Sequence, residues 1–306
     1  MILYILKRLW TTLLTLFMVV TLTFFLLRLM PGGPFDGEKN LPPKIKAKIE
    51  EKFGLNKPLL TQYKDYTLNL LKGDLGPSMK REGRTVNWVI GYSFPTSAKL
   101  GGVAVILSLT MGLILGILSA LNFNKWPDSF CMVLSTLGVT IPSFVIGVFL
   151  MYTFGVYYRV LPITGLKTLD SYILPSIALS GYSIAFISRL ARSKLIEVMK
   201  SDYIRTAKSK GLSRGKIIIK HALRNTLIPI VTYLGPLIAA ILTGSFVIES
   251  IFAIPGLGSE FVTTITNRDY TVVMGVTIFY STFLMICNLV VDILYVIIDP
   301  RIKLEN

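Results

Sequence analysis

The segment SDYIRTAKSKGLSRGKIIIKHALRNTLIP, residues 201–229, is basic, is broken by glycine, and lies between two long apolar runs. These runs cover residues 173–191 and 227–250. A helix needs roughly 20 mainly apolar residues to cross about 30 Å of hydrocarbon, so both runs are long enough to span a membrane. Basic residues beside membrane spans are typical of the cytoplasmic face. The segment is therefore predicted to be a cytoplasmic element between two transmembrane helices.

Composition extends this prediction to the whole chain. Of its 306 residues, 52% are hydrophobic and 16% are charged, and the mean hydropathy is +0.63. A soluble domain carries about 25% charged residues. The first apolar run is too long for a signal peptide and no small-residue cleavage site follows it, so we expect a retained helix. The sequence predicts an all-α polytopic membrane protein with six transmembrane helices, at residues 9–30, 97–121, 130–157, 173–191, 227–250 and 272–298.

Charge predicts the orientation of these spans. Lys7 and Arg8 precede the first span, which indicates a cytoplasmic N-terminus, and six spans return the C-terminus to the same side. The 192–226 connection holds ten Lys and Arg against two carboxylates, a net charge of +8 out of +15 for the chain, and is predicted to be cytoplasmic. The 31–95 loop holds eleven Lys and Arg against seven Asp and Glu and must lie outside. Loops longer than about 60 residues translocate largely regardless of charge, so this topology is retained.

Two short amphipathic helices are predicted in that outer loop. Apolar residues recur at helical spacing after Pro42 and again after Pro58, and the two patterns end at Gly54 and Gly73. The helices form either a cap packed over the outer ends of the spans or a docking platform for an extracytoplasmic partner, and the two interpretations are compatible.

The sequence does not indicate an enzyme. It has no glycine loop for nucleotide phosphates and no nucleophile, base or metal constellation in the spans, so no catalytic, cofactor or metal-binding residue is predicted. Its basic charge is explained by orientation and membrane lipid, and no nucleic-acid partner is expected. Charged residues toward the ends of spans either snorkel or form ion pairs, or alternatively serve ion coupling. They are Arg28, Lys99, Glu249 and Asp292.

Small residues and prolines in the spans predict two further features. Ser176, Ser180 and Ser183 share one helical face, which either lines a hydrated pathway or lets helices pack closely. Prolines within apolar runs should kink or end their helices, because each lacks the N–H of the helical ladder. These prolines are Pro142, Pro229 and Pro236.

The 201–229 segment itself predicts two short helices joined at a glycine. Ser201 suits the N-cap of the first helix and Gly211 suits the C′ position that ends it. Ser213 suits the N-cap of the second helix. The small residues Ala207 and Gly211 would also let another backbone approach closely.

The same segment resembles a known family. Arg205-Thr206-Ala207, Gly211 and Leu227-Ile228-Pro229 resemble the cytoplasmic coupling loop of binding-protein-dependent ABC importer permeases, with Arg205 in place of the leading glutamate. Eight further segments, in order along the chain, resemble the B-type oligopeptide permease subunit of such importers. They are RLMPGGPFDGEKNLPP at 28–43, FGLNKPLLTQY at 53–63, KGDLGPS at 72–78, SFPTSAKLG at 93–101, TIPSFVIG at 140–147, GSFVIESIFAIPGLG at 244–258, NRDYTVV at 267–273 and IDPRIK at 298–303.

The resemblance implies a type I ABC importer permease (MetI-like) core in the bacterial cytoplasmic (inner) membrane. Residues 1–93 would form an N-terminal helix and extracytoplasmic loop, 94–298 the core, and 299–306 a cytoplasmic tail. The implied partners are a homologous second permease subunit in a heterodimer, two cytoplasmic ABC ATPase subunits, and an extracytoplasmic peptide-binding receptor. The expected cargo is oligopeptides. Dipeptides, nickel or another small solute are alternatives within the family, and an ion-coupled secondary transporter is the alternative outside it.

The resemblance also implies two groups of site residues. The ATPase-coupling helix comprises Tyr203, Arg205, Thr206, Ala207 and Gly211. A gate or receptor contact at the outer face comprises Glu249, Pro255, Gly256 and Gly258. For this second group a structural turn is the alternative.

Overall fold

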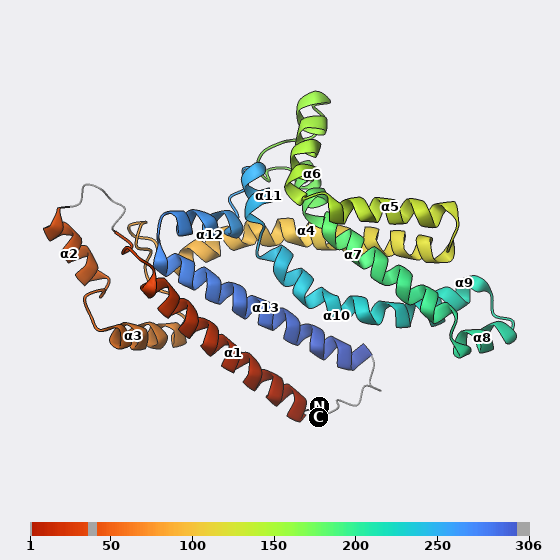
Figure 1. The fold of residues 1–306 in the computed structure, drawn as a ribbon, viewed down its shortest axis with the longest axis horizontal. Helices are drawn as coiled ribbons and strands as arrows, with labels where there is room; N and C mark the ends of the chain where they lie inside the picture. The colour runs from red at the N-terminus through yellow and green to blue at the C-terminus, as the bar shows by residue number, and fades with distance from the viewer. Residues whose placement is uncertain (1, 36–41, 299–306) are drawn as a thin grey trace.

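The computed structural model of the chain describes residues 2–35 and 42–298. Within these ranges it is helical, and its sheet-like pairing is limited to one isolated bridge between Pro77 and Thr85. The elements are α1 Ile2–Leu29, α2 Pro43–Lys52, α3 Leu59–Leu71, α4 Val86–Leu121, α5 Trp126–Thr140, α6 Ser143–Leu150, η1 Met151–Tyr157, η2 Leu169–Tyr172, α7 Ile173–Met199, α8 Asp202–Ser209, α9 Arg214–Lys216, η3 Ile217–Ala222, α10 Leu223–Leu242, α11 Phe246–Ile251, α12 Leu257–Thr266 and α13 Tyr270–Ile298 (Figure 1).

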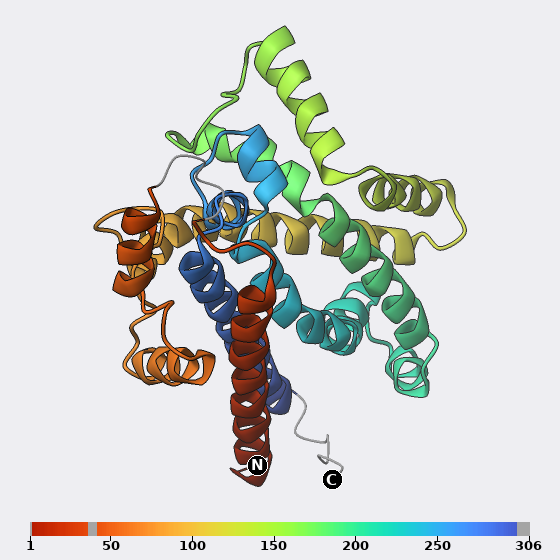
Figure 2. The same ribbon diagram turned by 60° about the vertical axis from the view of Figure 1, so that its left-hand side comes forward.

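The candidate membrane spans agree with the predicted fold class. Among the described residues five helical stretches are long and apolar enough to cross a membrane, and a bent pair raises the number to six if it counts as one span. That pair, α5 followed by α6 and η1, occupies the third predicted span and bends by 103°. Ile141 between the two helices is extended and Pro142 occupies the N-cap position of α6, because proline cannot continue the ladder of the preceding helix. The predicted break at Pro142 is confirmed, and α6 projects from the body (Figures 1 and 2).

The other two prolines do not end a helix. Pro229 and Pro236 both lie inside α10, which continues through them from Leu223 to Leu242. Of the two predicted outcomes, a kink or a helix end, the helix end is therefore wrong at these two positions, and the kink stays a prediction. The backbone departs from α-geometry upstream instead, where residues 217–222 form the π-helical turn η3.

Close helix packing at small residues forms the centre of the bundle. A Cβ added to Gly112 or Gly116 of α4 would lie within 2.8 Å of α7, and one added to Gly101 would lie 2.7 Å from the carbonyl oxygen of Ile241 in α10. Small residues allow such approach where apolar lipid gives no hydrophobic drive for association. The cluster at the junction of α4, α7 and α10 comprises Ala104, Val105, Ile187, Ala191, Ile230, Leu237 and Ile241.

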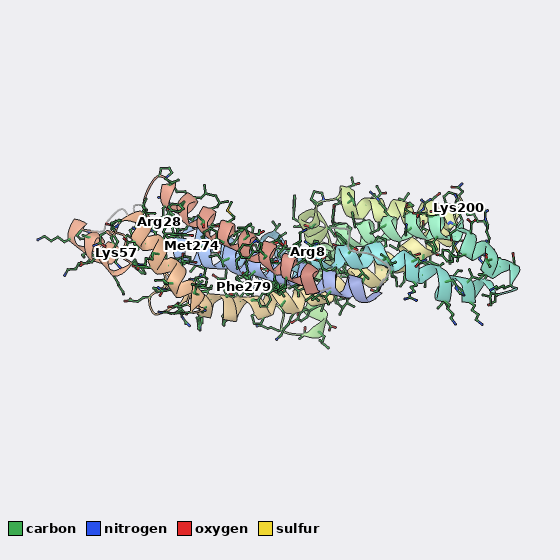
Figure 3. The ribbon with its side chains drawn as sticks, turned by 90° about the horizontal axis from the view of Figure 1, so that it is seen from below. Arg8, Arg28, Lys57, Lys200, Met274 and Phe279 are labelled. Carbon is green, nitrogen blue, oxygen red and sulfur yellow. The ribbon has the colours of Figure 1, made fainter. Side chains whose placement is uncertain are left out.

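The outer-loop helices α2 and α3 form as predicted and end at Gly54 and Gly73, both with positive φ. Tyr63 and Tyr66 of α3 pack with Phe24 of α1. The cap interpretation is thus supported for α3. In Figure 3, Arg28 and Lys57 of this region lie at the opposite end of the molecule from Lys200.

Candidate functional site

The predicted loop helix after α7 is present as α8. Ser201 occupies its N-cap position, but its hydroxyl donates to the carbonyl oxygen of Val198 at 2.6 Å and so completes the end of α7 instead. Gly211 follows α8 with φ of +74°, the left-handed conformation that glycine adopts at the C′ position. A Cβ on Gly211 would have no atom within 4 Å, so backbone conformation, and not close approach within this chain, accounts for the glycine.

The inner face of α8 is packed into its own chain. Ile204 is fully buried and Ala207 is 6% exposed. Both belong to one cluster with residues from α7 and from η3, namely Leu195, Val198, Ile217 and Ala222. Because this cluster joins α8 to the helices on both sides of it, α8 is held as part of a rigid body. Ala207 therefore contacts this chain's own core and does not face outward.

The outer face of α8 carries the other predicted residues. Tyr203 is 42% exposed, and its hydroxyl accepts a hydrogen bond from Asn225 Nδ2 of α10 at 2.7 Å. Arg205 and Asp202 form an exposed ion pair at 3.5 Å, and Thr206 is also exposed. Exposed ion pairs contribute little to stability, so this face is free to exchange its contacts for those of a partner.

A partly buried ion pair joins α7 to α5 near this loop. Arg192 donates from Nε and Nη2 to the two carboxylate oxygens of Asp128 in α5, at 2.7 and 2.8 Å. Asp128 is 4% exposed and also accepts from Ser119 of α4 and from the backbone N–H of Asn124. Bidentate pairs with additional donors are among the strong charge-assisted interactions. The sequence interpretation counted Arg192 only as a loop charge and missed Asp128, which the Trp126-Pro127-Asp128 helix start signals locally.

A large groove opens between α7, α8 and α10, with a volume of about 1120 Å³. We call it the α7–α10 groove. Its lining includes Phe186, Leu190, Tyr203, Asn225, Pro229 and Tyr233. The rings of Phe186 and Tyr233 lie 4.3 Å apart between centroids, so aromatic surface stands beside polar amide and hydroxyl groups. Since Tyr203 belongs both to this lining and to the exposed face of α8, the groove and the loop are continuous.

The serines predicted for a pathway lie elsewhere. Ser176, Ser180 and Ser183 are 1%, 0% and 5% exposed, and none of them lines the α7–α10 groove. Ser180 donates to the carbonyl oxygen of Ile177 within its own helix at 3.1 Å. Their burial fits close packing, Ser183 shares a hydrogen bond with the groove-lining Tyr233, and a role in the pathway stays a prediction. The residues that do line the groove were missed, although Phe186 and Tyr233 are aromatic residues in adjoining predicted spans.

The outer turn is organised around Glu249, which is fully buried. Its Oε1 accepts from Ser97 Oγ of α4 at 2.7 Å, and its Oε2 accepts from the backbone N–H of Ser259 at 2.8 Å. Ser97 Oγ in turn accepts from the N–H of Leu257 at 2.7 Å. One carboxylate therefore ties α11, α12 and α4 together, and Ser97 is a partner that the sequence did not indicate.

Two glycines make room for that carboxylate. A Cβ on Gly256 would lie 2.4 Å from the carboxyl carbon of Glu249, and one on Gly258 would lie 3.1 Å from its Oε2. Of the four residues predicted here, Pro255 is the exposed one. The arrangement supports the structural-turn alternative for Glu249, Gly256 and Gly258.

Two family models together match almost the whole sequence. Residues 112–304 match the family described as the binding-protein-dependent transport system inner membrane component, and residues 1–114 match its N-terminal region. The chain belongs to this family. It is accordingly a multi-pass integral membrane permease of a bacterial ABC importer, is not itself a catalytic enzyme, and works with ATPase and substrate-binding partners.

Curated relatives of the permease cover almost its whole length. The oligopeptide transport system permease protein OppB of Haemophilus influenzae is 48% identical over 98% of this chain and 99% of its own. The dipeptide transport system permease protein DppB of Bacillus subtilis is 44% identical over 99% of this chain and 98% of its own.

Two solved structures share the fold of the permease. The MetNI methionine ABC transporter in an inward-facing conformation aligns with a TM-score of 0.55 at 15% identity, covering 69% of this chain and 97% of that one. An amino acid ABC transporter crystallised with histidines aligns with a TM-score of 0.53 at 15% identity, covering 68% of this chain and 92% of that one. These likenesses support the predicted MetI-like core.

Proposed function

We propose that this permease carries oligopeptides across the bacterial inner membrane as one of two homologous permease subunits. Relatives named as oligopeptide and dipeptide permeases match it over 98% and 99% of its length, and dipeptides are therefore the second candidate cargo. Two cytoplasmic ATPases and an extracytoplasmic peptide-binding receptor complete the assembly. Both termini and the 192–226 loop lie in the cytoplasm.

The packing of α8 is the observation that carries the proposed coupling of this permease to its ATPases. Ile204 and Ala207 bury one face of α8 against α7 and η3, and Asn225 of α10 donates to Tyr203. Displacement of α8 therefore displaces α7 and α10 with it, since well-packed elements move as rigid bodies. An ATPase that pulls on α8 would move both main walls of the α7–α10 groove.

The proposed ATPase contact is the exposed face of α8. Tyr203, Arg205 and Thr206 present a hydroxyl, a guanidinium and a methyl-bearing alcohol to the cytoplasm. Ala207 and Gly211 set the position and the end of the helix. The proposed coupling helix thus has one exposed polar face and one buried apolar face that packs against α7 and η3.

The proposed pathway is the α7–α10 groove. Its aromatic pair, Phe186 and Tyr233, offers contact to side chains of varied shape, while Asn225 and Thr232 offer hydrogen bonds to peptide groups. Such a lining suits a cargo whose backbone is constant and whose side chains vary. The second permease would close the open side of the groove.

The extracytoplasmic part consists of the outer loop in residues 1–93 and of Pro255 in the turn after α11. The core is residues 94–298, although α4 runs without interruption across the boundary between the two parts. Residues 299–306, the proposed cytoplasmic tail, lie outside the described residues. Pro255 and the outer loop are the proposed receptor contacts.

Reconstitution tests this function. Proteoliposomes would hold the chain, its paired permease and two ATPases, with receptor on the outer side and ATP on the inner side. Labelled tripeptide should accumulate only when both receptor and ATP are present, and a labelled dipeptide and nickel measured in parallel rank the alternatives. Uptake by the chain alone, driven by an ion gradient, would contradict the proposal.

A further inference from the structure

A second cavity lies at the outer end of α1, far from the α7–α10 groove. It has a volume of about 310 Å³ and is enclosed by α1, α2, α3, the 74–79 loop and the start of α13. Arg28, Gln62 and Tyr66 contribute polar groups to its lining. Figure 3 shows Arg28, Lys57 and Met274, which also line it, gathered at this end of the molecule. We call it the Arg28 pocket.

Three polar groups of this pocket lack internal partners, whereas Lys57 and Asp65 in its lining pair with each other at 2.8 Å. Among the described residues, the guanidinium of Arg28 has neither a hydrogen-bond acceptor nor a carboxylate partner, and it lies 5.4 Å from the ring centroid of Phe24. The Tyr66 hydroxyl and Gln62 Oε1 are buried without a hydrogen-bond partner. Gln62 Nε2 donates to two backbone carbonyls, so its Oε1 is oriented as a free acceptor. Buried polar groups are normally satisfied, so the two buried, unpaired oxygens of Tyr66 and Gln62 in a pocket that also holds a guanidinium point to a ligand.

The chemistry of these groups suits a phosphate diester. A guanidinium presents several N–H donors in a fork that matches phosphate oxygens. Burial raises the pKa of the Tyr66 phenol above its ordinary value, so the side chain stays a neutral O–H donor beside Arg28. Gln62 Oε1 can accept a hydrogen bond from a hydroxyl or ammonium of the headgroup alcohol that is esterified to the same phosphate.

The depth of Arg28 in the membrane identifies the source of that phosphate. Arg8 and Arg28 are 20 positions apart on α1, which is about 30 Å at 1.5 Å per residue and equals the thickness of the hydrocarbon core. Arg8 pairs with Asp292 at the inner boundary, so Arg28 lies at the outer boundary, where phospholipid phosphates lie.

The helices around the pocket are suited to a lipid surface. Leu22, Leu26 and Leu29 on α1 are 55%, 64% and 73% exposed. On α3, Leu60 and Leu71 are 75% and 80% exposed and lie on one edge of the helix. An amphipathic helix with such an edge rests in the headgroup region. Acyl chains would thus have apolar surface directly beside the pocket.

We propose that the Arg28 pocket binds a phospholipid through its phosphate, and the orientation proposed above assigns this lipid to the outer leaflet. The guanidinium of Arg28 and the hydroxyl of Tyr66 donate to the phosphate oxygens. The bound lipid ties α1 to α3 and so supports the extracytoplasmic cap.

Native mass spectrometry of the purified full-length chain in detergent tests this site. Phosphatidylglycerol is titrated against wild-type protein and against Arg28→Gln, Tyr66→Phe and Arg84→Gln. One lipid should bind about tenfold more weakly to Arg28→Gln and about threefold more weakly to Tyr66→Phe. Arg84→Gln is the matched control, because Arg84 lies over the ring of Trp88 outside the pocket, and it should bind as the wild type does.

The remaining outcomes overturn the proposal. Equal binding by the wild type and both pocket variants would show that lipid does not use this site. Displacement of the lipid by millimolar inorganic phosphate would indicate a free-anion site, and displacement by a tripeptide would indicate a peptide subsite. Thermal unfolding of each variant checks folding, and if Arg28→Gln does not fold, Tyr66→Phe decides the result.

Discussion

The α8 loop and the turn around Glu249 differ in where they place the residues that sequence motifs single out. At α8 the motif residues Tyr203, Arg205 and Thr206 are exposed, and only the small Ala207 is buried. At the outer turn Glu249, the most polar of the motif residues, is fully buried, and Pro255 is exposed. The α8 motif therefore forms an exposed surface, whereas the Glu249 motif forms buried hydrogen bonds between helices.

The largest expected effect comes from placing a charge on the buried face of α8. Ala207→Asp puts a carboxylate without a partner into the cluster of α7, α8 and η3, and should lower the free energy of unfolding by about 3 kcal/mol or more. Thermal unfolding of the purified chain measures this. Thr206→Asp, at the exposed neighbour, should change stability by less than about 0.5 kcal/mol. Equal losses for the two variants would place Ala207 on the surface.

The second effect tests the hydrogen bonds of Glu249 that connect α11, α12 and α4. Glu249→Ala leaves Ser97 Oγ and the N–H of Ser259 without their acceptor, and should cost about 2–3 kcal/mol of unfolding free energy. Pro255→Ala is the control and should be nearly neutral. In a double-mutant cycle with Ser97→Ala the losses should be less than additive, because the two side chains share one network. Additive losses would mean that the two side chains act independently.

A third variant separates stability from coupling at the exposed face of α8. Arg205→Glu should leave the unfolding temperature unchanged, because the ion pair with Asp202 is exposed, and should weaken ATPase binding about tenfold. Copurification with the ATPase and stimulated ATP hydrolysis measure the second quantity. Lys125→Glu, on the α4–α5 connection, serves as a charge-matched control. A wild-type ATPase affinity for Arg205→Glu would remove Arg205 from the proposed contact.

The smallest effect distinguishes conformation from close approach at Gly211. Gly211→Ala should cost about 1 kcal/mol, because its φ of +74° disfavours a Cβ although no atom lies within 4 Å. Gly211→Asn should recover part of the loss. Thermal unfolding should show the same penalty with and without bound ATPase. A penalty that appears only in the complex would mean that the ATPase backbone approaches Gly211 closely.

Local signals in the sequence predicted the elements and their ends. The apolar runs indicated the spans, Pro142 indicated the break before α6, and Gly54, Gly73 and Gly211 indicated helix ends. Each of these depends on residues within a few positions of one another. Pro229 and Pro236 do not end α10, because the packing of α10 against α4, α7 and α13 outweighs the local preference of proline for a helix end.

Which side of an element faces inward could not be predicted, because it depends on partners far away in the chain. Ser97 and Glu249 are 152 positions apart, and Asp128 and Arg192 are 64 apart. Small residues were ambiguous for the same reason. Ala207 and Ser180 suit both a close contact with another chain and the interior of this one, and only their neighbours in space decide.

The ion pair between Arg8 and Asp292 has a consequence for biogenesis. The two residues are 284 positions apart, so the N-terminal part of α1 pairs with a helix that is translated 284 residues later. At about 5–20 residues per second, α1 waits roughly 15–60 s for this partner. During that interval it must reside in the bilayer without α13, and its leucine-rich, largely exposed surface makes this possible. Its lipid-facing character is thus a requirement of assembly order as well as a property of the finished protein.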